Sequence, residues 1–215
     1  MTAKQRLALD VGVAYVAAWL VGLGFGLAVK ATGEWTLGAP WERDALRWMH
    51  EHPLPWMLDQ LMLVMPYFGT NLTILPLIIV VALVVWKRFG HPLMAAQLVL
   101  VCVGSLSVNI FMKHLLVRPR PAIYPLRGMF AWASYPSGHL ILTPALYLTA
   151  SLLLHRLQGW RWPFVVTVIV TVLTAYSRLY LSVHWPTDLV GGLLIGLTWL
   201  LGTWRAFERY RRRAV

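Results

Sequence analysis

The chain has 215 residues, of which 59% are hydrophobic and only 13% are charged. Soluble domains carry about 25% charged residues, so this composition excludes a water-soluble domain and indicates an integral membrane protein. The net charge of +11 comes from basic residues at the ends of apolar runs rather than along one face. That placement argues against nucleic acid as a partner and favours anionic membrane lipids.

Six apolar runs follow one another, at residues 11–29, 61–86, 92–112, 140–154, 162–177 and 189–204. Pro66 and Pro76 interrupt the second run. A membrane-spanning helix needs about 20 residues, so the first three runs suffice alone and polar residues shorten the last three. We therefore predict an all-α polytopic membrane protein with six transmembrane helices, forming one domain over residues 1–215. Lys4 and Arg6 give the first run a signal-peptide-like start, but its length favours an uncleaved helix.

The segment between the first two runs, residues 30–59, holds five of the eight acidic residues and the tryptophans Trp35, Trp41, Trp48 and Trp56. Tryptophan is common at membrane interfaces. Arg43, Arg47 and Glu51 recur at four-residue steps, which places them on one face of a helix. The segment therefore predicts an interfacial helix, with an irregular loop as the alternative.

The distribution of lysine and arginine predicts the topology. With six spans both termini share a side, and the other side holds eight basic residues. The side of the termini holds eleven: Lys4, Arg6, Lys87, Arg88, Arg156, Arg161, Arg205, Arg209, Arg211, Arg212 and Arg213. We expect both termini in the cytoplasm. Three polar islands, at residues 113–121, 136–139 and 177–188, would then meet at the extracytoplasmic face.

The islands combine cations and imidazoles with a single carboxylate, which indicates an anionic ligand such as a phosphate. In the third island Pro186 favours a helix start, so Asp188 in the first turn can reach back to His184. A carboxylate on one ring nitrogen leaves the other as a nucleophile or base. Arg178, six residues earlier, can clamp an oxyanion at His184.

The other two islands supply further anion contacts. Ser137 is a good N-cap residue and Gly138 permits close backbone approach, so the fourth span can present free N–H groups to an anion. His139 in that turn suits a general acid. Lys113 and Arg120 flank a proline-marked break and can converge on the same anion.

Together the islands resemble the signature of the type 2 phosphatidic acid phosphatase (PAP2) superfamily, which reads Lys-x6-Arg-Pro, Pro-Ser-Gly-His and Ser-Arg-x5-His-x3-Asp. Every position is filled, from Lys113 to Asp188. The resemblance implies a phosphatase without metal or cofactor, in which His184 forms a phosphohistidine, Asp188 orients it and His139 protonates the leaving oxygen. Lys113, Arg120, Arg178, Ser137 and Gly138 would bind the phosphate. Arg118 has the wrong spacing for the signature and is expected to be peripheral.

Several substrates stay open: phosphatidic acid, phosphatidylglycerol phosphate, undecaprenyl diphosphate or a lipid A phosphate. Gly138 slightly favours the broader lipid phosphate group, since many undecaprenyl-diphosphate members carry Asp there, but it does not exclude diphosphates. The apolar chain could lie against Leu126, Met129, Phe130, Trp132 and Tyr135, although these residues are at least as well explained as anchors at the membrane interface. Alternatives are a lipid phosphotransferase and a non-catalytic membrane subunit, while six apolar spans argue against the soluble vanadium haloperoxidases that share this anion cradle. We expect a bacterial inner-membrane location.

Overall fold

The computed structural model describes residues 1–128 and 132–213, and within them the regular structure is helical. The helices are α1 (Ala3–Ala31), α2 (Pro40–Glu51), α3 (Trp56–Val64), α4 (Asn71–Leu83), α5 (Pro92–Leu115), α6 (Gly138–Thr143), α7 (Thr149–Gln158), α8 (Trp162–Tyr180) and α9 (Pro186–Arg213). A 3-10 turn (Met65–Gly69) precedes α4. Turns of π-helix follow α4 (Val84–Arg88) and join α6 to α7 (Pro144–Leu148).

Six helical segments of the described chain are long and apolar enough to cross a membrane: Ala3–Ala31, Asn71–Arg88, Pro92–Leu115, Gly138–Gln158, Trp162–Tyr180 and Pro186–Arg213. The predicted all-α, six-span class is confirmed. The second span begins at Asn71, well inside the apolar run of residues 61–86. Pro66 has no N–H to donate, and the chain turns through Met65–Gly69 before α4 begins at Asn71.

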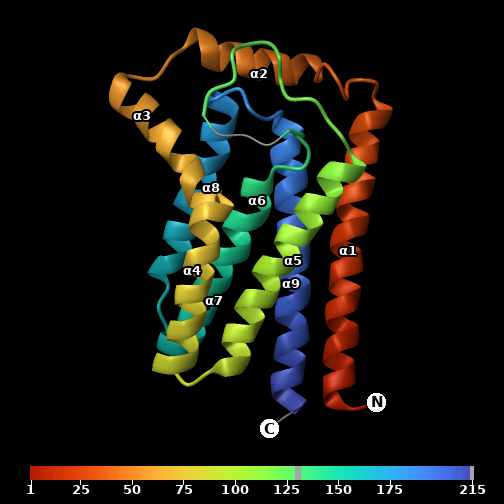
Figure 1. The fold of residues 1–215 in the computed structure, drawn as a ribbon, viewed down its shortest axis with the longest axis vertical. Helices are drawn as coiled ribbons and strands as arrows, with labels where there is room; N and C mark the ends of the chain where they lie inside the picture. Colours follow the sequence, from red (N-terminus) through yellow and green to blue (C-terminus); the bar gives the residue numbers. More distant parts are fainter. Residues whose placement is uncertain (129–131, 214–215) are drawn as a thin grey trace.

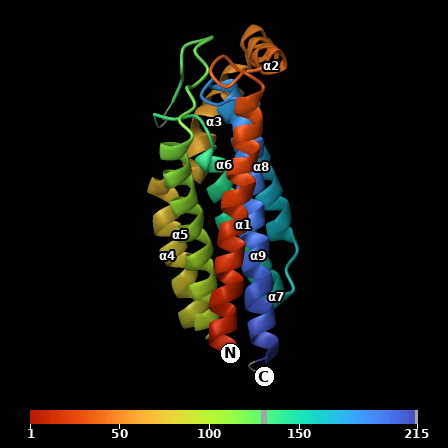
Figure 2. The ribbon, with the colours of Figure 1, turned by 90° about the vertical axis from the view of Figure 1, so that its right-hand side faces the viewer.

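The spans lie side by side with both termini at one end, as Figures 1 and 2 show. The segment from α2 to α3 and the described residues between α5 and α6 cover the opposite end (Figure 1). This agrees with the expectation that the termini share a side and that the three polar islands meet at the other. The islands therefore lie under the α2–α3 segment.

Small residues let the first and last spans approach closely. The side of α1 that faces the bundle is built from Ala14, Ala18, Gly22 and Gly26, all buried. A Cβ atom at Gly22 would lie 2.8 Å from the side chain of Ile195 on α9. Such contacts hold helices together in lipid, where burial of apolar surface provides little driving force. The pairing of α1 with α9 fixes where the first turn of α9 lies.

The helix expected within residues 30–59 is present as α2, followed by α3, and α2 lies across the end of the bundle in Figure 1. Arg47 and Glu51 are exposed on it, as predicted for a polar face. Glu42, a charged residue of the same helix, is completely buried, which the sequence analysis did not predict. Trp35 is also buried, unlike the exposed Trp41, Trp48 and Trp56.

Candidate active site

The third island folds as the sequence predicted. Pro186 is the first residue of α9, His184 lies just before it, and Asp188 is in the first turn. The Oδ2 atom of Asp188 lies 3.4 Å from His184 Nδ1 and accepts a 2.8 Å hydrogen bond from the backbone N–H of Trp185. The carboxylate therefore faces one ring nitrogen of His184 and leaves the other directed elsewhere.

The second island begins the fourth span. Ser137 occupies the N-cap position, but its hydroxyl makes no capping bond and has no hydrogen-bond partner within the described chain. Its backbone N–H donates to the carbonyl of Asp188 at 3.0 Å, which ties the second island to the third. The hydroxyl of Ser137 is thus left without a partner in a fully buried position.

The first island supplies two cations that backbone carbonyls hold in place. Lys113 Nζ donates to the carbonyls of Ala133 at 2.7 Å and Ser134 at 3.2 Å. Arg120 donates to the carbonyls of Val183 and Ala133. The island is therefore fastened to the loops before α6 and α9, and this brings segments distant in the sequence to one place.

A cavity of about 260 Å³ opens among the three islands. Six of the eight predicted site residues line it: Lys113, Arg120, Gly138, His139, Arg178 and His184. The other two, Ser137 and Asp188, are fully buried and are not among the lining residues. The Nε2 atom of His139 is buried and has no hydrogen-bond partner among the residues described. Three cations and two imidazoles on one small cavity suit a tetrahedral anion.

Part of the cavity wall was missed by the sequence analysis. Asn109 on α5 and Gly69, Thr70 and Asn71 before and at the start of α4 line it as well. Asn109 lies one helical turn before Lys113, so the i, i+4 spacing alone could have placed it on the same face. No sequence signal marked residues 69–71, because only the packing of α4 against the bundle brings them there.

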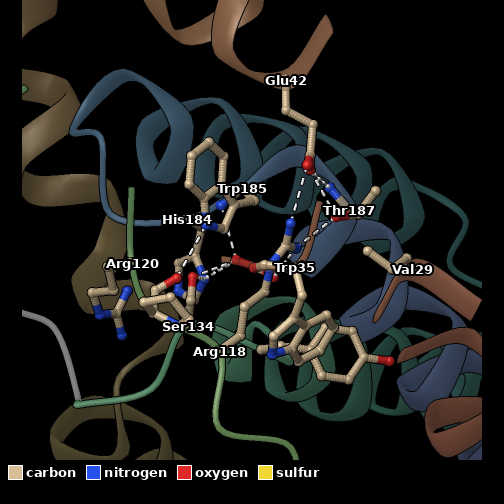
Figure 3. Close-up of polar contacts among 12 residues, drawn as sticks. Val29, Trp35, Glu42, Arg118, Arg120, Ser134, His184, Trp185 and Thr187 are labelled. Atoms are coloured by element: carbon tan, nitrogen blue, oxygen red, sulfur yellow. Dashed lines mark hydrogen bonds and ion pairs between the residues drawn. The ribbon is translucent and has the colours of Figure 1, made fainter. Parts of the chain in front are cut away.

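Ser134 is a second residue that the signature does not contain. Its hydroxyl donates to Asp188 Oδ2 and lies 3.5 Å from His184 Nδ1. It is fully buried. Because it contacts both side chains, Ser134 helps to fix their relative position; Figure 3 labels Ser134 and His184.

Arg118 is not peripheral, contrary to the sequence expectation. It is completely buried, and its NH1 group donates to Asp188 Oδ1 at 2.7 Å. Its NH2 group forms a 3.0 Å ion pair with the equally buried Glu42 of α2 (Figure 3). The spacing argument failed because Arg118 reaches Asp188 rather than the cavity.

The residues expected to contact the apolar chain of the lipid differ in their exposure. Trp132 is exposed and Leu126 is half-buried. Tyr135 is fully buried and donates a 2.6 Å hydrogen bond to the carbonyl of Gly22, so it belongs to the core instead. Met129 and Phe130 lie outside the described residues.

Burial and neighbouring charges shift the pKa values of His184 and Arg120 in this site. Burial, together with the cations Arg120, Arg178 and Lys113, holds the pKa of His184 well below its usual range. Burial lowers the pKa of Arg120 to about 10, which leaves it cationic at neutral pH. Neutral imidazole beside fixed cations is the state a nucleophile requires. Within residues 1–128 and 132–213, no group of three or more His, Cys, Asp or Glu side chains could hold a metal ion.

Comparison with known proteins agrees with this geometry. The family model described as PAP2 superfamily matches residues 94–212, more than half of the chain. The chain belongs to the PAP2 superfamily. An undecaprenyl-diphosphatase of Sulfolobus acidocaldarius is 28% identical over 70% of this chain and 68% of its own. Phosphatidylglycerophosphatase B of Bacillus subtilis is 29% identical over 66% of this chain and 71% of its own.

A solved structure shows the same PAP2 fold. The crystal structure of a transmembrane PAP2 type phosphatidylglycerolphosphate phosphatase from Bacillus subtilis superposes with a TM-score of 0.77, covering 91% of this chain and 96% of that one at 22% identity. At this identity the similarity concerns the fold. Residues 94–212 of the family match contain all three islands, whereas Glu42 and the α2 helix lie outside it.

Proposed function

We propose that this PAP2 protein is a membrane phosphatase that hydrolyses a lipid phosphate through a phosphohistidine at the extracytoplasmic face. The observation that carries the proposal is the single cavity lined by Lys113, Arg120, Arg178, His139 and His184. Phosphoryl transfer depends mainly on positioning and on positive charge around the equatorial oxygens. Lys113 and Arg120, which backbone carbonyls hold, and the buried Arg178 provide that charge.

In the first step, His184 attacks phosphorus through the ring nitrogen that faces away from Asp188. An N–P bond forms as the P–O bond to the lipid breaks, and His139 gives its proton to the departing oxygen. Asp188 stabilises the positive charge that develops on the ring of His184. The 3.4 Å approach of Asp188 Oδ2 to Nδ1 supports this assignment.

In the second step, His139 removes a proton from water, and the resulting hydroxide attacks the phosphohistidine. The N–P bond breaks, its electron pair returns to His184, and inorganic phosphate leaves. Lys113, Arg120 and Arg178 hold the phosphoryl oxygens throughout, with the hydroxyl of Ser137 and the backbone at Gly138 as further donors. The unpartnered Ser137 hydroxyl supports its role.

The substrate is a lipid with a phosphate or diphosphate headgroup. The relatives named above act on undecaprenyl diphosphate and phosphatidylglycerol phosphate, by their names. The cavity lies at the end of a bundle of apolar spans, where a lipid headgroup would meet it. In the bacterial inner membrane, with both termini cytoplasmic, this end would face outward.

The test is phosphate release by the purified protein in detergent with EDTA, on phosphatidic acid, phosphatidylglycerol phosphate and undecaprenyl diphosphate. Wild type should release phosphate, and His184→Ala should lose roughly 10³-fold or more in rate. His155→Ala, an exposed histidine at the other end of the bundle, should match wild type. Silence on every lipid, or an active His184→Ala variant, would refute the proposal.

Membrane orientation has its own test. Cys102 is buried, so single added cysteines report topology with little background. Trp56→Cys, exposed at the site end, should react with an impermeant maleimide in intact spheroplasts. Trp160→Cys, between α7 and α8 at the end that holds the termini, should react only after lysis. The reverse pattern would place the site in the cytoplasm.

A further inference from the structure

A chain of buried charges leads from the α2 helix to the histidine of the site. Glu42, Arg118 and Asp188 are all completely buried, and their side chains follow one another in that order at 3.0 Å and 2.7 Å. Asp188 Oδ2 then approaches His184 Nδ1 at 3.4 Å. Figure 3 shows Glu42 above this row, entering from a different helix.

Glu42 also holds the first turn of α9 directly. Its Oε1 atom accepts from both the backbone N–H of Thr187, at 3.0 Å, and the Thr187 hydroxyl, at 2.7 Å. The first N–H groups of a helix have no partner within that helix, and a carboxylate there is favourable. Glu42 thus caps the helix that carries Asp188, although it comes from 145 residues earlier in the chain.

Arg118 is held from several sides. Besides the two carboxylates it donates to the carbonyl of Trp35 at 3.0 Å and to the hydroxyl of Thr187 at 2.7 Å. Its guanidinium also lies over the rings of Trp35 and Trp185. A planar group fixed on this many sides can hold Asp188 in one orientation only.

Such a network is a poor device for stability alone. Buried ion pairs often contribute no more than apolar residues of the same volume, because the charges lose their hydration. Two carboxylates on one guanidinium leave one negative charge in excess, beside a cavity lined by three cations. The arrangement is explained if Asp188 has to be kept negatively charged and in one position beside His184.

We propose that Glu42 is a positioning residue of the phosphoryl-transfer site, which acts through Arg118 and Thr187 to fix Asp188 against His184 and to preserve its negative charge. The expected effect on turnover rests on the proposed function, whereas the expected effect on the titration of His184 does not. It makes α2, which lies outside the family match, a required part of the catalytic apparatus. Glu42 itself does not line the cavity and is not a catalytic residue.

Charge changes at Glu42 and at Arg118 should move the titration of His184 in opposite directions. Glu42→Gln leaves the positive charge of Arg118 directed at Asp188 alone, so protonated His184 becomes less stable and its midpoint falls. Arg118→Met removes that cation, so the midpoint rises. A unit charge roughly 10 Å away at an effective dielectric of about 20 shifts a pKa by about one unit.

The other groups around His184 come from several elements and are unchanged by these substitutions. They are Lys113 of α5, Arg120 of the α5–α6 connection, His139 of α6, Arg178 of α8 and Asp188 of α9. The double variant Glu42→Gln/Arg118→Met has lost one charge of each sign. Its midpoint should return close to that of wild type.

The experiment measures both turnover and titration. For Glu42→Gln we expect a 10- to 100-fold fall in kcat with KM within about twofold, because the residue touches no substrate. The His184 midpoint, from 15N-histidine NMR, reports the charge without any turnover. Glu42→Asp keeps the charge and should keep the midpoint. Glu51→Gln, an exposed carboxylate at the end of the same helix, is the matched control and should behave as wild type.

The outcomes separate clearly. Opposite midpoint shifts in the two single variants, with recovery in the double variant, support the inference even if no lipid is hydrolysed, in which case the proposed function alone fails. If Glu42→Gln melts at a lower temperature but keeps the wild-type kcat and midpoint in its folded fraction, Glu42 is only structural and the inference is overturned. A wild-type result for every variant overturns it as well.

Discussion

The contact between α6 and α9 should control activity more than stability, and Gly192→Ala tests this. A Cβ atom at Gly192 would lie 2.5 Å from the backbone carbonyl oxygen of Ser137, where ordinary contact begins at 3.4 Å. The start of α6 would therefore have to move away from α9 by about 0.9 Å. Ser137 and His139 on α6 would then be displaced from Asp188 on α9.

The two consequences of this displacement differ in size. Misplacing catalytic groups by about 1 Å can cost roughly 10²-fold in rate. Overpacking costs about 1–3 kcal/mol, while replacing a helical glycine with alanine returns about 1 kcal/mol, so the net loss of stability is about 2 kcal/mol at most. We expect a folded protein with about 1% of wild-type phosphate release.

The assay compares phosphate release and thermal melting of Gly192→Ala with those of Gly24→Ala. Gly24 is an exposed glycine of α1, and a Cβ atom there meets nothing within 4 Å. That control should retain full activity and melt at the same temperature or slightly higher. Activity of Gly192→Ala within twofold of the control would refute the argument that close α6–α9 packing positions the site.

Three further predictions concern individual groups. Gly138→Ala places a Cβ atom 2.7 Å from Asn109 Nδ2, so phosphate release should fall about tenfold, and adding Asn109→Ala should restore part of it. Because the pKa of His184 is lowered, the neutral nucleophile persists as pH falls, and the acid limb of kcat/KM should have its midpoint below about 6.5; a midpoint above that contradicts the assignment. Tyr135→Phe loses the hydrogen bond to Gly22 and should lower stability by about 1 kcal/mol, measured by thermal melting, with turnover unchanged.

The sequence by itself determined the class and the number of spans, and it predicted eight site residues, six of which line one cavity. Hydrophobic length alone indicates a membrane helix, because the lipid core has a fixed thickness. The spacing of His184 and Asp188 across a helix start is likewise local, and the structure brings them within 3.4 Å. The interruption of the second apolar run at Pro66 is local as well, and the structure has its break there, at Met65–Gly69.

Only the tertiary structure decided which groups support those residues. Ser134 reaches Asp188 across 54 positions, and Arg118 reaches Glu42 across 76. No periodicity in the sequence encodes such contacts, because they follow from how α1, α2 and α9 pack. A buried glutamate on an otherwise amphipathic helix has the same sequence pattern as an exposed one, and its partner becomes visible only when α2 lies across the end of the bundle.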